Sequence, residues 1–117
     1  MASPTLEQLT GEILASFENY NRQGTHPWTG FTAVEDLPYQ LGSLTKLTMQ
    51  LKGSRFAEGK TEAELKAKMG DELADILAEV LYAAHDFNID LAEAWQKMLH
   101  SDYQKVEERT DGKSSTS

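Results

Sequence analysis

The chain has 117 residues, with 11 lysines and arginines against 19 aspartates and glutamates, and a net charge of −8. This length indicates one domain, and the acidic surface argues against a nucleic-acid polymer as partner more than against a nucleotide whose phosphates are bridged by a divalent cation. No apolar run approaches the roughly 20 residues that span a bilayer, and the start MASPTLEQLT lacks an export-signal pattern. The absence of cysteine excludes disulfides and thiolate metal sites. We therefore expect a cytoplasmic protein with no membrane partner.

Apolar residues at helical spacing predict a first helix over about residues 4–21. Ser3 is its expected N-cap, Pro4 lies in its first turn, and Gly24 can end it. Its apolar stripe consists of Leu6, Leu9, Ile13, Phe17 and Tyr20. The segment GTHPWTGFTAVED that follows is rich in glycine and threonine, which predicts a loop.

The second helix is predicted to begin near Asp36, because Pro38 is tolerated in a first helical turn but not in a helix interior. Gly53 ends it. Its expected inner stripe is Leu37, Leu41, Leu44, Thr48 and Leu51. The connector GSRFAEGK is short, so the next helix should pack beside this one and run antiparallel to it.

The longest helix opens with TEAE, in which Thr61 and Glu64 form a capping-box pattern, and it extends to about Phe87. Its expected apolar face is Leu65, Met69, Leu73, Ile76, Val80 and Ala84, and Asn88 can close it.

The same capping logic in Asp90 and Glu93 opens a fourth helix. It carries Leu91, Trp95, Met98, Leu99 and Val106, and the spacing of Trp95 predicts a core position for it. The end of the chain has no apolar residue, so we expect one domain over residues 1–107 and a disordered tail over 108–117. Four amphipathic helices predict an all-α four-helix bundle.

The segment GDELADILAEV, residues 70–80, contains three carboxylates on one edge of the third helix. At 100° per residue, Glu72, Asp75 and Glu79 fall within about 60° of each other, at the margin of the apolar stripe. Two such carboxylates can share a Mg²⁺ ion, which prefers oxygen ligands. Spacing alone favours a solvated face, whose acids interact with the helix dipole and pair with Lys68.

The segment ELADILAEVLYAAHDFNIDLAEAW, residues 72–95, resembles the MazG-like family of all-α nucleotide pyrophosphohydrolases. Glu72 and Asp75 match the ExxD motif of that family, and NID at 88–90 matches its turn into the last helix. The similarity extends from about residue 18 to 107. It implies a MazG-type fold, Mg²⁺ (or Mn²⁺) held by Glu72 and Asp75, and a homodimer or homotetramer.

The partner motif of the family, EExxE, falls on YQLGSLTKL, residues 39–47, where this chain lacks the acids. Gln40 and Ser43 stand at two of those positions, on one side of the helix, and would oppose Glu72 and Asp75. The loss of two formal charges weakens Mg²⁺ binding and argues against a second ion. Glu79 either replaces them as ligand or base or, as its position favours, faces solvent.

The resemblance also implies nucleotide-binding residues. Trp28, with His26 beside it in the loop before the second helix, either stacks on a base or plugs the end of the bundle. Lys46 and Arg55 are candidates to hold a triphosphate. His85 stands where the family often has an asparagine near the nucleotide, although a lone histidine there is more often a surface or packing residue.

The resemblance thus implies a Mg²⁺-dependent hydrolase that cleaves a nucleoside triphosphate to a monophosphate and pyrophosphate, in nucleotide-pool housekeeping. Its catalytic residues would be Glu72, Asp75 and Glu79. Two alternatives stay open at this point: a catalytically weakened nucleotide-binding protein on the same scaffold, and a helical structural oligomer.

Overall fold

A computed structural model of the chain describes residues 2–24 and 26–115. The surroundings of the side chains are described up to residue 110. Within these residues it contains four helices and no strand. They are α1 (Leu6–Gln23), α2 (Gly30–Lys52), α3 (Glu62–Asp86) and α4 (Leu91–Ser115). The prediction of an all-α chain with four helices is confirmed. None of the described helices has the length and apolar character that crossing a membrane requires.

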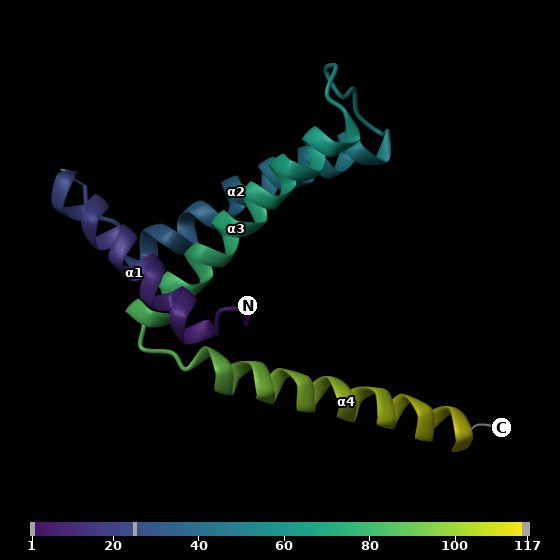
Figure 1. The fold of residues 1–117 in the computed structure, drawn as a ribbon. Helices are drawn as coiled ribbons and strands as arrows, with labels where there is room; N and C mark the ends of the chain where they lie inside the picture. The colour runs from purple at the N-terminus through teal and green to yellow at the C-terminus, as the bar shows by residue number, and fades with distance from the viewer. Residues whose placement is uncertain (1, 25, 116–117) are drawn as a thin grey trace.

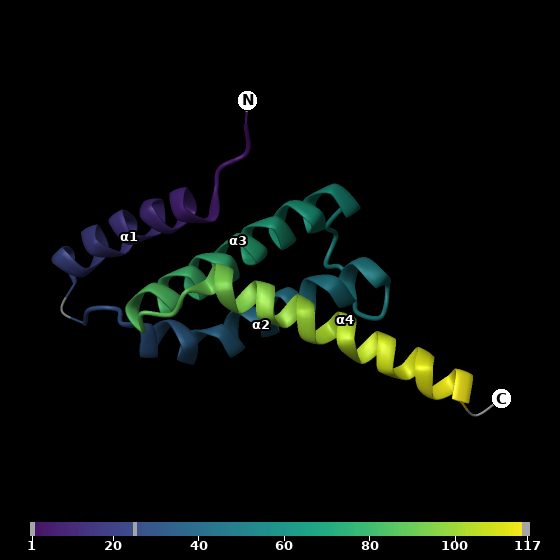
Figure 2. The same cartoon turned by 90° about the horizontal axis from the view of Figure 1, so that it is seen from below.

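The helices α2 and α3 form a long antiparallel hairpin, and α1 packs on the end of α3 that lies away from the hairpin connector (Figure 1). The helix α4 leaves this body and diverges from the hairpin, making few contacts with the other helices. Figure 2 shows the same arrangement from below, and the far end of α4 lies beyond the end of the hairpin. One chain alone therefore does not close the predicted four-helix bundle.

Helix α2 begins six residues earlier than the sequence predicted. Thr29 caps it, because its side chain accepts a hydrogen bond from the Thr32 amide at 3.3 Å. The amide of Gly30 donates to Oδ2 of Asp86 at 2.6 Å, which anchors this end of α2 to the end of α3. A Cβ on residue 30 would lie 2.8 Å from that oxygen, so the close approach requires glycine. Pro38 therefore lies inside the helix, where it lacks one backbone hydrogen bond.

The other helix ends follow local capping chemistry. Thr5, rather than Ser3, caps α1, and it forms a capping box with Gln8. The predicted Thr61 capping box of α3 is present, and Gly53 ends α2 in the left-handed region with φ 90°. Helix α4 continues to Ser115, beyond the predicted domain end at residue 107, and residues 116–117 of the predicted tail lie outside the described part.

The core lies where α1, α2 and α3 meet. Ala33 of α2 and Tyr82 and Ala83 of α3 are buried there, and Phe17 and Trp28 pack against them. The ring of Phe17 stacks on Trp28 with centroids 5.5 Å apart and meets Tyr82 edge-on at 4.4 Å. The Tyr82 hydroxyl donates to the Trp28 carbonyl at 2.8 Å, so its polar end is satisfied.

Several expected core positions are exposed instead. Leu41 of α2 and Leu73 of α3 are about half exposed, whereas Leu47 and Leu65 on the same two helices are buried. Trp95 is 57% exposed, because α4 does not pack on the body, so its predicted core position is wrong for the single chain.

Candidate acidic site between α2 and α3

Two carboxyl groups meet across the interface of the hairpin. Glu79 of α3 is 4% exposed, and its side chain hydrogen-bonds to Asp36 of α2, which is half-buried. The Gln40 amide, one turn further along α2, donates to Oδ2 of Asp36 at 3.0 Å. The preferred expectation that Glu79 faces solvent is therefore wrong, because α2 covers it.

The surroundings of this pair shift the pKa values of the two acids in opposite directions. Burial raises the pKa of Glu79 to about 8, and its hydrogen bond to Asp36 and the negative charges of Asp36 and Asp75 act in the same direction. Hydrogen bonds from Glu79 and Gln40 lower the pKa of Asp36, against the opposing effect of burial. At neutral pH, Glu79 is thus a neutral donor and Asp36 is the charged acceptor.

The contact between Asp36 and Glu79 sets the register of the hairpin. Because α2 and α3 are antiparallel and rise equally per residue, each turn forward on α2 meets one turn back on α3. Gln40 therefore lies near the level of Asp75, and Ser43 near the level of Glu72. The expected opposition of the two altered positions to the ExxD residues fits this register.

Two carboxylate oxygens at this interface have no hydrogen-bond partner in the protein. They are Oε2 of Glu72 and Oε2 of Glu79, both buried, and among the described residues neither accepts a hydrogen bond from an N–H or hydroxyl group, so the contact of Glu79 with Asp36 is one between two carboxyl groups. A buried oxygen without a donor costs free energy, which a proton, a water or a cation can offset. Asp75, by contrast, is exposed.

The donor chemistry fits a hard cation, but with few ligands. Mg²⁺ is usually held by one or two carboxylates together with waters and substrate phosphates, and Glu72 and Asp75 supply oxygen donors of this kind. Among the described residues, no group of three or more histidine, aspartate or glutamate side chains is arranged to hold a metal ion.

Sequence reasoning missed Asp36. It treated this residue as the start of the second helix, whereas the Thr29 cap extends the helix and places Asp36 in its second turn. The available signal was the spacing of Asp36 and Gln40, which are four residues apart and so share one face once the helix is known to begin earlier.

Trp28 belongs to the core at the α1 end of the hairpin. Its ring stacks on Phe17. Its backbone amide donates to Oδ1 of Asn21 at 2.7 Å, and its carbonyl accepts from Nδ2 of the same side chain at 3.1 Å. These contacts correspond to the packing alternative for Trp28. His26, two residues earlier, is exposed.

The other predicted nucleotide-binding residues lie at opposite ends of the hairpin. The Lys46 ammonium pairs with Glu58 of the connector at 3.7 Å, and Arg55 is an exposed residue of the same connector. His85 lies near the far end of α3, roughly 35 Å along the helix from its first residue, Glu62, beside the connector. One chain therefore does not bring these residues to one ligand.

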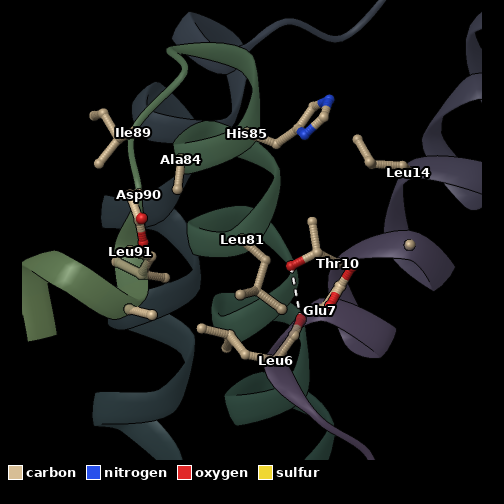
Figure 3. Close-up of a pocket in the computed structure, with 12 residues that line it drawn as sticks. Leu6, Glu7, Thr10, Leu14, Leu81, Ala84, His85, Ile89, Asp90 and Leu91 are labelled. Atoms are coloured by element: carbon tan, nitrogen blue, oxygen red, sulfur yellow. Dashed lines mark hydrogen bonds between the residues drawn. The ribbon is translucent and has the colours of Figure 1, made fainter.

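His85 borders a groove between α3 and α1. Figure 3 shows its side chain extending from α3 toward α1, with Leu14 opposite and Leu81 deeper between the helices. The groove has a volume of about 560 Å³ and is open to solvent.

No family model matches the chain, and neither a curated protein nor a solved structure matches it.

Proposed function

We propose that the chain is a Mg²⁺-dependent nucleoside triphosphate pyrophosphohydrolase of the MazG type, with its site at the α2–α3 interface. The observation that carries the proposal is the buried, unpartnered Oε2 of Glu72, which belongs to the ELAD motif and lies near the level of Ser43 in the hairpin register. A buried carboxylate oxygen with no donor is open to a ligand that the chain itself does not supply. The resemblance of residues 72–95 names the reaction.

The residues of the chain divide into two roles in this proposal. Glu72 and Asp75 would hold Mg²⁺, which when bound supplies positive charge against the phosphates. Asp36 keeps its negative charge at neutral pH and can accept a hydrogen bond from a water. Glu79 is neutral there and orients Asp36, so the role of base that the sequence suggested for Glu79 would require deprotonation near pH 8.

The proposal includes a cytoplasmic homodimer or homotetramer that acts on small phosphorylated molecules. The net charge of −8 supports a small ligand over a nucleic-acid polymer.

The test is the release of pyrophosphate from the ribo- and deoxynucleoside triphosphates, with and without Mg²⁺. Glu72→Gln removes one charge at the half-buried position, and Asp71→Asn removes one charge at the exposed neighbouring position. We expect Mg²⁺-dependent release by the wild type and by Asp71→Asn, and a loss on the order of a hundredfold or more in Glu72→Gln. Equal release by both variants would place the reaction elsewhere.

A nucleotide-binding protein with weak hydrolysis is the second candidate. Gln40 and Ser43 favour it, because an amide and a hydroxyl stand where the family has carboxylates. Glutamates at both positions should strengthen Mg²⁺ binding and create or raise hydrolysis. No change in either property would show that these positions do not belong to the metal site.

The helical structural oligomer remains a third candidate. The exposed apolar residues of α4 favour it, because this helix makes few contacts with the other described helices of the single chain. In that case the wild type would release no pyrophosphate and would bind no Mg²⁺.

A further inference from the structure

The helix α4 carries an apolar stripe that none of the described residues of the single chain covers. The stripe consists of Trp95, Met98, Tyr103 and Val106, which are 57%, 44%, 69% and 58% exposed. These residues share one side of the helix, at its 3.6-residue period. In water, most of the stability of a helix comes from packing of its apolar face, so α4 requires a partner for this side.

A second apolar surface faces the angle between α4 and the hairpin. Leu77 of α3 and Trp95 of α4 line a groove of about 440 Å³ where α4 leaves the body. Leu73 lies one turn before Leu77 on α3, and both are about half exposed. Leu73 and Leu77, called here the α3 strip, extend this apolar surface along the hairpin.

The chain is too open for a monomer of its size. Its accessible surface is 8967 Å², whereas a compact chain of 13.1 kDa would expose roughly 6,400 Å². Its radius of gyration is 19.1 Å, against about 13 Å for a compact domain of this length. The excess, about 2,600 Å² per chain, is as large as the surface that one subunit contributes to a large obligate homodimer.

We propose that a second copy of this chain covers both surfaces, with the α4 stripe of each copy packed on the α3 strip of the other. A two-fold arrangement makes this contact twice, so each copy buries its stripe and its strip together. A single bound peptide would fill one groove and leave the rest of the excess surface exposed. This contact specifies the homo-oligomer of the proposed function, but it rests on shape and exposure and is independent of the hydrolase activity.

Sedimentation of the full chain over a micromolar to millimolar range tests the proposal. We expect a dimer, or a larger assembly of dimers, in place of the 13.1 kDa monomer. Tyr103→Asp puts a charge on the stripe, and the matched Gln104→Asp puts the same charge on the neighbouring position, which faces the other side of α4. Tyr103→Asp should raise the dissociation constant at least a hundredfold, or about 2.7 kcal/mol, while Gln104→Asp leaves it near the wild-type value.

Leu77→Asp tests the other half of the contact, and it should weaken association as Tyr103→Asp does. Circular dichroism and urea unfolding of each variant show whether α1, α2 and α3 remain folded. A wild-type chain that stays monomeric, in an extended shape or with α4 folded back on its own body, would overturn the proposal. A dimer that both aspartate variants leave intact would also overturn it.

Discussion

The hairpin of α2 and α3 and the helix α4 depart from simple burial rules in opposite directions. The hairpin buries a carboxyl group, because Glu79 is 4% exposed, whereas α4 exposes an indole, because Trp95 is 57% exposed. Buried carboxyl groups cost free energy unless a proton, partner or ion compensates them. Contiguous exposed apolar patches mark interaction surfaces. The first departure therefore points to chemistry and the second to assembly.

We expect the largest difference in stability between variants of two tyrosines. Tyr82 is buried and bonded to the Trp28 carbonyl, and Tyr103 lies exposed on α4. Tyr82→Ala should lower the free energy of unfolding by about 3–5 kcal/mol, because it leaves a cavity and removes one of the two hydrogen bonds that the Trp28 carbonyl accepts. Tyr103→Ala, measured by urea unfolding of a dilute monomeric chain, should change it by less than about 0.5 kcal/mol. Similar losses in the two variants would mean that α4 packs on the body of its own chain.

The buried carboxyl group predicts a pH dependence of stability. Its folded pKa, about 8, lies above its ordinary value of 4.5, so the folded state binds the extra proton between these values. The stabilisation from Glu79 is complete below about pH 4.5 and is lost as the pH rises to 8, with a slope of at most about 1.4 kcal/mol per pH unit. The lowered pKa of Asp36 changes the free energy of unfolding only at pH values below this window.

Glu79→Gln removes this titration and keeps an amide that can donate to Asp36. Without divalent cations, we expect the variant to have a flatter stability profile from pH 5 to 8 and to exceed the wild type above pH 8. Denaturation at several pH values measures both. Glu107→Gln on exposed α4 is the matched control and should keep the wild-type slope. An unchanged slope in Glu79→Gln would show that this carboxyl group does not hold the extra proton.

Removing the N-cap side chains of α3 and α4 should have smaller effects, and these effects should differ between the two helices. The Thr61 hydroxyl accepts from the Glu64 amide at 3.1 Å, and the Asp90 carboxylate accepts from the Glu93 amide at 3.0 Å. Thr61→Ala should lower the free energy of unfolding by about 1 kcal/mol, because α3 is part of the packed hairpin. In the dilute monomer, Asp90→Ala should reduce helix content by circular dichroism with little effect on that free energy. A larger loss for Asp90→Ala than for Thr61→Ala would contradict the independence of α4.

Local chemistry made most of the helices predictable. Apolar periodicity located all four, and the Thr61 box, Gly53 and Gly24 marked ends that the structure confirms. The start of α2 was wrong because Pro38 was given more weight than the Thr29 cap. That error has a direct consequence for the site, because it hid Asp36, the hydrogen-bond partner of Glu79.

Tertiary placement was less accessible from the sequence. The periodicity of α4 shows that one face of the helix is apolar, but it does not show whether this face packs within the same chain. For this reason Trp95 was wrongly assigned to the core. The ELAD carboxylates were located by pattern, whereas the burial of Glu79 depends on the helix that faces it. Spacing cannot reveal that dependence.

We propose that the carboxylates of α3 hold a divalent cation. Isothermal titration of the apo chain with Mg²⁺, repeated with Mn²⁺ and on the variants Glu72→Gln and Asp71→Asn, tests it most directly. We expect saturable binding by the wild type and Asp71→Asn, weakened by at least about tenfold in Glu72→Gln. Equal binding by all three proteins, or no binding by the wild type, would contradict it.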